Sequence, residues 1–469
     1  MSSNKKNQFL YVLLLIILGI SFASKSGYDS DSLYSFSQAK DLIKFGSLSG
    51  WSFSAITFIV PDLIFSLPFA AFLDNPYIFH LITSPIQIIL FVYLFSVYYK
   101  SKNTDMNFWI VFTTTTLSTV VIAIISLFLR GGFYFAVEPF FVFVHHGFAA
   151  LSAVLVFLYS KDNSFLVLRK HYIWSSFGFF LLIVSDFYFA LYFGFLIIST
   201  FDKTQWKKTL LFAVAFGALS IATFGGSYLF NPSLGAQVNN SLNITNYSRV
   251  GILIHMLLIL LVPTILVFLL WLKCKLTEEF KQLYIALFLV AFTIFFMGLI
   301  IDMYAFRYIA IVYPISIIFC TEILLMTPKN YKTLLLCFCY IGVLSLTIYA
   351  NFLKEKPNRF VYYDEIKCIE EMNLSHATIV ATYWPAKMIF ESTNRQNNLI
   401  QVDKNLKEYN WIYNDRWKSL YRDNGFTFVI TDHLSSEVIL RLKEKNETQS
   451  LCGGKVLLIH SEAASVVSE

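Results

Sequence analysis

Long apolar runs recur along the first three quarters of this chain of 469 residues. Many approach the roughly 20 residues that a helix needs to cross a hydrocarbon core about 30 Å thick. The runs are Phe9–Phe22, Tyr77–Tyr98, Phe108–Leu129, Phe140–Leu158, Tyr172–Ser185, Phe187–Phe201, Thr209–Phe230, Val250–Leu272, Leu283–Ile301, Tyr304–Met326 and Leu334–Leu353. Only 14% of the residues are charged, against about a quarter in soluble domains. We therefore expect an α-helical polytopic membrane protein with about eleven transmembrane helices.

The apolar segment Ile56–Leu73 is different, because it contains Pro61, Asp62 and Pro68. In lipid it would leave backbone groups unpaired and an acid exposed, so we predict a re-entrant or juxtamembrane hairpin that does not cross. The Lys-rich loops then fall on the cytoplasmic side, as the positive-inside rule requires. These loops contain Lys100, Lys102, Lys161, Arg169, Lys170, Lys203, Lys207, Lys208, Lys273, Lys275, Lys329 and Lys332. The N-terminus is then cytoplasmic, although Ser21-Phe22-Ala23 leaves a cleaved signal peptide open as an alternative to a retained anchor.

The composition becomes that of a water-soluble domain at Lys354. We predict a transmembrane module over residues 1–353, with its first outer loop at 24–75, and a small extracytoplasmic α/β domain over 354–469. In this domain Asp364–Met372 and Ser435–Lys445 have helical spacing, and Ala377–Tyr383, Phe426–Ile430 and Lys455–Ile459 are β-rich. Its tryptophans, Trp384, Trp411 and Trp417, suit either a surface that meets sugar or membrane, or an ordinary core. Its two cysteines, Cys368 and Cys452, could form a disulfide on the outer side.

Ionisable residues within an apolar chain are functional candidates. Here they lie on the predicted outer side: Asp29, Asp31, Asp62, Arg130, Glu138, His145, His146, Asp186, His255, Asp302 and Arg307. Asp186 and Asp302 could instead cap turns, and the paired histidines could be interfacial. Arg307, about one turn inside an apolar run, needs an anionic partner, either Asp302 or a phosphate.

The chemistry of these residues fits a sugar donor linked to a lipid phosphate. Arginine holds a phosphate with a planar fork of donors, and a carboxylate can act as base toward an acceptor hydroxyl. No cysteine pair has zinc-ligand spacing and no Gly-rich phosphate loop follows a strand, so a kinase or a nucleotide-driven transporter is unsupported. The basic residues are scattered, which argues against a nucleic-acid partner.

These residues resemble the membrane-embedded GT-C glycosyltransferases. The similar features are an N-terminal anchor, an outer loop with Asp29 and Asp31, an amphipathic helix, Trp51 followed by Pro61-Asp62, the Ser185-Asp186 turn, and Arg307-Tyr308. The segment Ala381-Thr382-Tyr383-Trp384-Pro385-Ala386-Lys387 resembles a Tyr-Trp-x-Ala-Lys element of bacterial members. The resemblance covers the whole chain in architecture but only these short motifs in sequence. The O-antigen-modifying glucosyltransferases of bacterial and phage origin look closest in size and layout.

The resemblance implies an inverting hexosyltransferase of the bacterial inner membrane that serves the cell envelope, for example its lipopolysaccharide. It would move a sugar from a polyprenyl-phosphate donor to a glycan or lipid-linked acceptor on the outer face, in contact with membrane lipids. Asp31 would be the base and Asp29 its partner. Many relatives have an adjacent Asp-Glu pair instead of this Asp-Ser-Asp, so the roles of the two acids stay open. The substrate-binding candidates are Arg307, Tyr308, Asp62, Arg130, Glu138, His146 and Asp186.

Three questions remain open from sequence. A divalent metal is one, because two acids alone do not make a metal site. A polytopic transporter or flippase for a lipid-linked saccharide is the main alternative function, although it would usually show internal repeats and polar groups near mid-membrane. A membrane acyltransferase using His145-His146 would leave the acids of the first loop unexplained.

Overall fold

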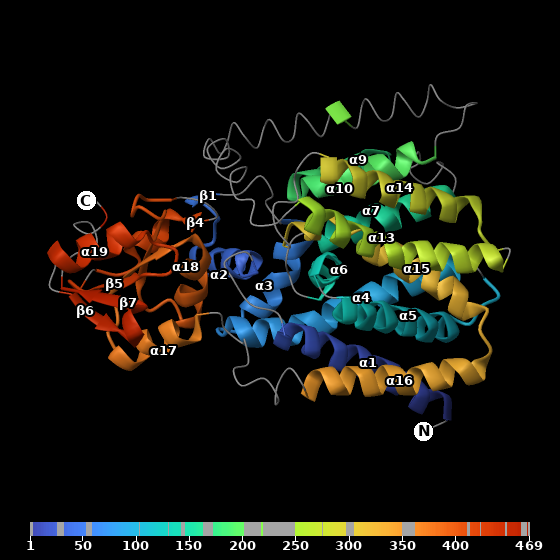
Figure 1. Cartoon of the computed structure of the whole chain (residues 1–469), viewed down its shortest axis with the longest axis horizontal. Coiled ribbons are helices and arrows are strands. Elements are labelled where there is room, and N and C mark those ends of the chain that lie inside the picture. The colour runs from blue at the N-terminus through green and yellow to red at the C-terminus, as the bar shows by residue number, and fades with distance from the viewer. Residues whose placement is uncertain are drawn as a thin grey trace. The chain divides into compact units, whose positions relative to one another are not determined.

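The structure is a computed structural model. It describes residues 3–25, 32–52, 59–102, 104–129, 131–141, 146–162, 172–200, 217–218, 249–273, 275–296, 304–348, 362–409, 413–422, 424–445, 448–460 and 467. Contacts divide these residues into two units, coloured by residue number in Figure 1. The helical unit holds the described residues of Met1–Ser24, Leu81–Phe230 and Gly235–Glu355. The sheet unit holds those of Lys25–His80 and Lys356–Glu469.

The described part of the helical unit is built from helices. They are α1 (Ser3–Lys25), α4 (Pro76–Lys102), α5 (Phe108–Leu129), α6 (Gly131–Val137), η2 (Glu138–Phe140), α7 (Gly147–Asp162), α9 (Tyr172–Ser185), α10 (Phe187–Ile198), α13 (Arg249–Leu272), α14 (Glu278–Phe296), η3 (Tyr304–Ile309), α15 (Val312–Leu325) and α16 (Lys329–Ile348). The boundary between the units cuts two helices. Lys25, the last residue of α1, and the start of α4 up to His80 belong to the sheet unit.

Four of the described helices are long and apolar enough to cross a membrane: α4, α5, α13 from Val250, and α14. The prediction of a mostly helical, membrane-type protein is confirmed at this level. The apolar stretches of α1, α7, α10, α15 and α16 are 10–17 residues long, shorter than the roughly 20 residues of a full crossing. The number of about eleven spans is therefore not established. Apart from residues 217–218, the predicted run Thr209–Phe230 lies outside the described residues.

Helix α5 packs against α15 through hydroxyl groups. The hydroxyl of Thr321 donates to that of Ser118 at 2.9 Å, and the Tyr313 hydroxyl donates to the carbonyl of Thr119 at 3.2 Å. All four residues are buried in the helical unit. Between helices in lipid, small and hydroxyl-bearing residues supply the association that hydrophobic burial supplies in water. These two hydrogen bonds fix the position of α5 along α15.

One end of the helical unit carries an ion pair between Lys102, at the end of α4, and Glu279, at the start of α14. The Tyr98 hydroxyl also donates to Glu279 Oε1 at 2.9 Å. Lys102 and Lys275 belong to two different loops that the positive-inside rule assigns to the cytoplasm. Since Glu279 follows Lys275 by four residues, these two loops lie at the same end of the unit, as the predicted alternation requires.

The sheet unit combines a mixed five-stranded sheet with a two-stranded one. Its elements are α2 (Tyr34–Phe45), β1 (Trp51–Ser52), η1 (Ile59–Leu63), α3 (Ile64–Ala70), α17 (Tyr363–Met372), β2 (Thr378–Thr382), α18 (Tyr383–Ser392), β3 (Asn398–Val402), β4 (Tyr413–Asn414), η5 (Asp415–Ser419), β5 (Thr427–Ile430), α19 (Ser436–Lys445), β6 (Thr448–Leu451), η6 (Cys452–Gly454) and β7 (Val456–Ile459). The strand order is β3-β2-β5-β7-β6. Strands β3, β2 and β5 are parallel, whereas β7 is antiparallel to both β5 and β6.

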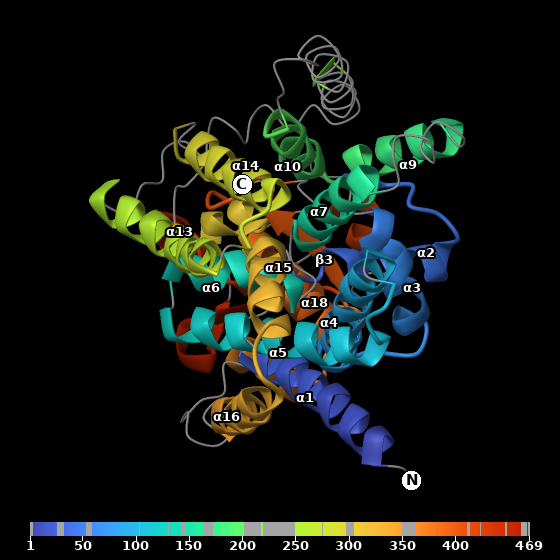
Figure 2. The same cartoon turned by 90° about the vertical axis from the view of Figure 1, so that its right-hand side faces the viewer.

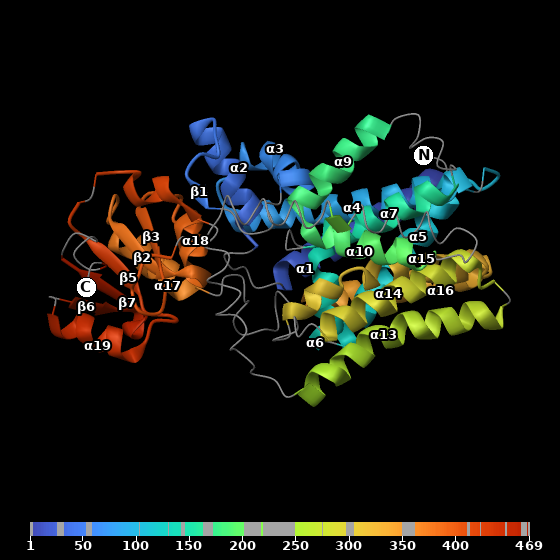
Figure 3. The same cartoon turned by 90° about the horizontal axis from the view of Figure 1, so that it is seen from above.

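Helices cover the two faces of the five-stranded sheet (Figure 3). Successive side chains of a strand point to opposite faces. One face packs on α19 through a cluster that includes Val380, Val429, Leu457 and Leu442. Ile379 lies on the other face, with Leu399 of β3 and Phe428 of β5, which pair with it. On that face α18 packs against β2 and β3 and also contacts α17. The predicted α/β character of the C-terminal region is confirmed, and the predicted elements α17, β2, β5, α19 and β7 are present.

Part of the predicted first outer loop belongs to the sheet unit. Strand β1 pairs antiparallel with β4, so that Trp51 faces Asn414 and Ser52 faces Tyr413. Helix α2 ends at Gly46, whose φ of 66° gives the left-handed turn that leads into β1. The amphipathic helix expected after the first apolar run is therefore α2, and it is folded together with the C-terminal region.

Asp41, in the middle of α2, is fully buried and accepts hydrogen bonds from residues that follow it by 10 to 376 positions. Its carboxylate takes the indole N–H of Trp51 at 2.8 Å and that of Trp417 at 3.0 Å. It also accepts from the Asn414 side-chain amide at 2.5 Å and pairs with Arg395 at 2.5 Å. A buried carboxylate needs this degree of pairing, since an uncompensated charge is costly in a protein interior.

Arg395 completes the network. Its guanidinium binds Glu391 in a two-pronged manner, with Nη2–Oε1 at 2.5 Å and Nε–Oε2 at 2.8 Å, and also donates to the Ser37 carbonyl at 3.1 Å. Ser37 in turn donates to Glu391 Oε1 at 2.6 Å. Burial by itself would lower the pKa of Arg395, but the carboxylates of Glu391 and Asp41 raise that pKa above its usual value. We call Asp41, Arg395 and Glu391 the carboxylate–arginine network.

The segment Ile56–Leu73 is described from Ile59 and forms two short helical pieces, η1 and α3. A break in the helix lies at Val60, whose φ of −123° and ψ of 123° are non-helical. Residues 59–70 would span about 18 Å at 1.5 Å per residue, well short of a bilayer core. That the segment does not cross the membrane stays a prediction.

A disulfide joins Cys368 of α17 to Cys452 of η6, with a Cα–Cα distance of 6.2 Å. The disulfide hypothesis is therefore confirmed. Of the three tryptophans, Trp417 is a fully buried core residue and Trp384 is 40% exposed. The interpretation of a tryptophan surface is wrong for Trp417, because its ring packs against Phe390 and Tyr413. Trp411 lies outside the described residues.

Candidate functional site

The most concentrated group of predicted site residues is in the helical unit, where His146 meets Asp186. Nδ1 of His146 lies 2.9 Å from Oδ2 and 3.1 Å from Oδ1 of Asp186. Both side chains are buried. An ionised carboxylate can only accept, so Nδ1 of His146 carries a proton and donates it to Asp186. The carboxylate thus fixes the orientation of the ring.

Aromatic rings and a cation surround this pair. The rings of Tyr188 and Tyr308 are stacked, with centroids 4.8 Å apart and planes 3° from parallel. The His146 ring lies 4.2 Å from that of Tyr188 and 5.3 Å from that of Tyr308. The Arg307 guanidinium carbon is 5.5 Å from the centroid of the Tyr308 ring. We call Arg307, Tyr308, His146, Asp186 and Tyr188 the His–Arg cluster.

Local structure places each member. Asp186 interrupts the apolar run between α9 and α10 with an extended backbone, and its Oδ1 accepts the N–H of Tyr188 at 2.9 Å, which makes it the N-cap of α10. Its carboxylate therefore serves the helix and His146 together. Tyr308 is held by Tyr192, whose hydroxyl donates to the Tyr308 carbonyl at 2.8 Å.

The backbone of His146 is unusual, since its φ is 70°. Non-glycine residues in this left-handed region are uncommon and tend to occur at functional sites. The next residue, Gly147, is needed for space: a Cβ there would lie 2.4 Å from the Pro139 carbonyl oxygen. The contact brings the η2 turn, which begins at Glu138, beside the start of α7.

The electrostatics of the site favour an anion. Helices α7 and α10 pack together (Figure 2), and both begin at the His–Arg cluster. Each N-terminus carries a partial positive charge, and Arg307 adds a full one. A single carboxylate, Asp186, faces them within the cluster. A phosphate could therefore be held there by Arg307, with the partial positive charge of the helix N-termini adding to the attraction.

The His–Arg cluster lies at the opposite end of the helical unit from the Lys102–Glu279 ion pair. Helix α5 begins six residues after Lys102 and runs for 22 residues, or about 33 Å. Helix α6 follows it and packs against η3, which carries Arg307. The cluster is thus at the end away from the Lys-rich loops.

Three further candidates are described and are not members of the cluster. His255 lies in α13, with its ring centroid 6.0 Å from that of Phe306. Glu138 starts η2, and its Oε1 accepts the Tyr134 hydroxyl at 3.1 Å. Asp62 is in η1 of the sheet unit. Asp29, Asp31 and Arg130 lie outside the described residues, as do His145 and Asp302. Their predicted roles therefore stay predictions.

Sequence reasoning missed Tyr188 and Tyr192 in this site and the carboxylate–arginine network in the sheet unit. In an apolar run rich in aromatic residues, the two tyrosines carry no distinguishing pattern, although their spacing of four residues places them on one face of α10. The sequence did contain a signal for Asp41. It is an acid on the predicted amphipathic helix, whose buried residues also include Tyr34 and Phe36.

Among the described residues, no group of three or more His, Cys, Asp or Glu side chains could hold a metal ion. Asp29 and Asp31 are not among these residues. Comparisons with protein-family models, with curated proteins and with solved structures find no match to this chain. The GT-C resemblance therefore stays a prediction from short motifs.

Proposed function

We propose that this chain is a membrane glycosyltransferase. It transfers a hexose, with inversion, from a polyprenyl-phosphate donor to a glycan or lipid-linked acceptor on the outer face of the membrane. The observation that supports this most is the His–Arg cluster: an arginine, a histidine–aspartate pair and stacked tyrosines gather where two helices begin, in a unit with candidate membrane spans.

In this proposal, the cluster holds the donor. Arg307 binds the lipid phosphate with its permanent charge and planar fork, and the helix N-termini favour the same anion. The leaving polyprenyl phosphate needs charge stabilisation more than it needs protonation. His146, oriented by Asp186, hydrogen-bonds the sugar or the phosphate through Nε2, and the stacked Tyr188 and Tyr308 offer an apolar face beside it.

The acceptor hydroxyl is deprotonated by Asp31 in the first outer loop, with Asp29 as its partner. The position of the cluster, away from the Lys-rich end of the helices, supports an outward-facing site. The finer architecture belongs to the same proposal: about eleven spans in a GT-C-like arrangement, a cytoplasmic N-terminus, and a bacterial inner membrane as the location.

The test is transfer in isolated membranes that contain the wild-type chain. Polyprenyl phosphate carrying a labelled hexose is supplied with a cell-envelope glycan, and label in the glycan is measured against expression level. A glycosyltransferase moves label to the glycan and releases polyprenyl phosphate. A flippase leaves the sugar–phosphate bond intact. Labelled lipid that crosses the membrane, with no label appearing in the glycan, would therefore contradict the proposal.

Arg307→Lys separates the role of the fork from that of the charge. Lysine keeps the charge but loses the two-pronged geometry, so the KM for the donor should rise by about tenfold while transfer persists. Arg422→Lys, at an exposed position of the sheet unit, is the matched control and should leave the KM unchanged.

A further inference from the structure

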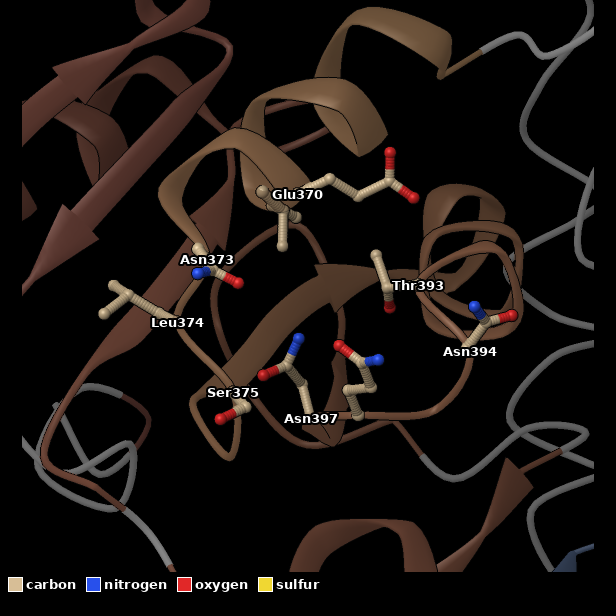
Figure 4. Close-up of a pocket in the computed structure, with 9 residues that line it drawn as sticks. Glu370, Asn373, Leu374, Ser375, Thr393, Asn394 and Asn397 are labelled. Atoms are coloured by element: carbon tan, nitrogen blue, oxygen red, sulfur yellow. The ribbon is translucent and has the colours of Figure 1, made fainter.

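A polar depression lies in the sheet unit between the end of α17 and the loop that joins α18 to β3 (Figure 4). Its volume is about 200 Å³, below the roughly 300–1,000 Å³ of pockets that hold drug-sized ligands. It has room for one small ring. We call it the amide pocket and define it by Glu370, Asn373, Thr393, Gln396 and Asn397.

Asn397 sets the polarity of the pocket floor. The residue is 3% exposed, and its side-chain oxygen accepts the N–H of Ala377 at 3.0 Å. Because the atom that accepts must be the oxygen, the amide orientation is fixed and Nδ2 is the remaining donor. Nδ2 makes no hydrogen bond to any residue that the structure describes. Figure 4 shows the Asn397 side chain directed into the space between Asn373 and Thr393.

The surrounding groups add both donors and acceptors. Thr393 uses its hydroxyl proton on the carbonyls of Ile389 and Phe390, at 2.9 and 3.2 Å, so its oxygen can still accept. The side chains of Asn373 and Gln396 make no hydrogen bond to other described residues. Each therefore offers one acceptor and two donors. Glu370 adds a carboxylate at the edge.

The loop that forms one wall is held in an uncommon backbone conformation. Asn394 and Arg395 have φ values of 52° and 53°, and Asn373 across the pocket has 50°. Arg395 turns inward, where Asp41 and Glu391 bind it. Consecutive non-glycine residues in the left-handed region are strained and occur preferentially at ligand sites. The buried ion pairs thus fix the loop with Gln396 and Asn397 beside the pocket.

The lining discriminates between ligand classes. None of its nine described residues is Lys, Arg or His, which disfavours a phosphate or a carboxylate ligand. Only Ile369 and Leu374 are apolar, which disfavours a hydrophobic one. Each hydroxyl of a sugar both donates and accepts, and so matches a wall of amides, one hydroxyl and one carboxylate. We infer that the amide pocket binds a neutral hexose unit of a glycan. That this glycan is the acceptor rests on the proposed function.

The test is direct sugar binding to the full chain in phospholipid nanodiscs, without sugar-based detergents. Saturation-transfer NMR is recorded with D-glucose, D-galactose, N-acetyl-D-glucosamine and L-rhamnose as probes. At least one probe should give a signal, and both Asn373→Gly and Gln396→Ala should weaken its Kd by about fivefold or more. Glycine adopts the φ of Asn373 without strain, so that variant removes the amide alone.

Asn405→Ala removes an exposed amide elsewhere in the sheet unit and should leave the Kd unchanged. No signal from any probe, or a Kd that neither pocket variant alters, would overturn the inference. If one variant unfolds, the other decides. Pocket-dependent binding without glycosyl transfer would leave the pocket standing and remove the proposed function. Transfer without pocket-dependent binding would remove only the pocket.

Discussion

At the scale of single residues, Asp41 links α2 to the C-terminal part of the sheet unit. Its carboxylate is fully buried and accepts from Arg395, Asn414 and two indoles. Asp41→Asn removes the charge that Arg395 pairs with but keeps the size of the side chain. Removing one partner of a buried ion pair costs about 3–5 kcal/mol, so the free energy of unfolding should fall by that order.

Tryptophan fluorescence during thermal unfolding would follow this change, because Trp51 and Trp417 both donate to Asp41. Lys40→Ala is the neighbouring control. Lys40 pairs with Asp74, whose side chain is 84% exposed, and such surface pairs contribute about 1 kcal/mol or less. Equal melting temperatures for the Asp41 variant and wild type would show that the carboxylate–arginine network does not stabilise the unit.

Asp186 has two functions that substitution can separate. Asp186→Asn preserves a good N-cap for α10 but replaces a charge-assisted hydrogen bond to His146 with a neutral one. Under the proposed function, transfer should fall by about 10- to 100-fold with little change in melting temperature. Asp186→Ala should reduce both, since the cap is lost as well. An Asn variant that transfers at the wild-type rate would exclude the histidine–aspartate pair from the reaction.

At the scale of elements, sequence patterns identified the parts of the sheet unit that are apolar and periodic. Helices α17 and α19 and strands β2, β5 and β7 were predicted near their observed bounds. Strand β3 was missed because it contains Gln401, which is polar yet fully buried, and β6 because it is a polar edge strand, Thr448–Leu451. Helix α18 was not among the predicted elements. It carries Pro385 in its first turn, where proline is tolerated.

The disulfide between Cys368 and Cys452 closes 84 residues and ties α17 to the β6–β7 connection. Removing a native disulfide typically costs about 2–5 kcal/mol, mainly because the unfolded chain gains freedom. The double variant Cys368→Ala/Cys452→Ala should melt at a correspondingly lower temperature. A reducing agent should destabilise wild type and leave the double variant unchanged. Insensitivity of the wild type to reduction would contradict this role.

Because of Tyr413, the free energy of unfolding of the sheet unit should fall as the pH rises through the alkaline range. Burial, and then the charges of Asp415 and Glu408, raise the pKa of Tyr413 well above its usual value, and its hydroxyl donates to the Leu399 carbonyl. The group keeps its proton more tightly when folded. Its contribution is therefore fully present below about pH 10, the unfolded pKa, and is lost as the pH rises toward the folded pKa.

Melting temperatures between pH 8 and 11 measure this dependence. Tyr413→Phe should start less stable, since it lacks the hydrogen bond, but should lose less stability over that interval. Parallel curves for the variant and wild type would mean that another group causes the alkaline loss.

At the scale of the whole molecule, the composition identified the membrane class, but it did not show that residues 25–80 fold with residues 356–469. That association depends on contacts across more than 350 residues, such as Asp41 with Arg395, and no local pattern encodes them. The His–Arg cluster was partly foreseen, since Arg307, Tyr308, His146 and Asp186 were all candidates. Their proximity depends on how α7, α10 and η3 pack, which one sequence does not show.

Sidedness can be tested on intact cells with an impermeant maleimide, in a background lacking Cys274 and the exposed Cys337. Ser49→Cys, in the sheet unit, should be labelled because this loop is predicted to face outward. Lys275→Cys, in a Lys-rich loop, should react only after the membrane is opened. The reverse pattern would invert the whole topology and place the His–Arg cluster at the cytoplasmic face.

The proposal that this chain breaks the bond between sugar and lipid phosphate is tested most directly with purified protein in lipid vesicles. The measurement is the rate at which polyprenyl phosphate is released from a labelled donor when acceptor glycan is present. Wild type should release it, and Asp31→Asn should be slower by about 10²–10⁴-fold, as expected for loss of a general base. If Asp29→Asn is the slow variant instead, the two acids exchange roles. Wild-type rates in Asp31→Asn, Asp29→Asn and Arg307→Lys, or no release by wild type, would contradict the proposed glycosyltransferase.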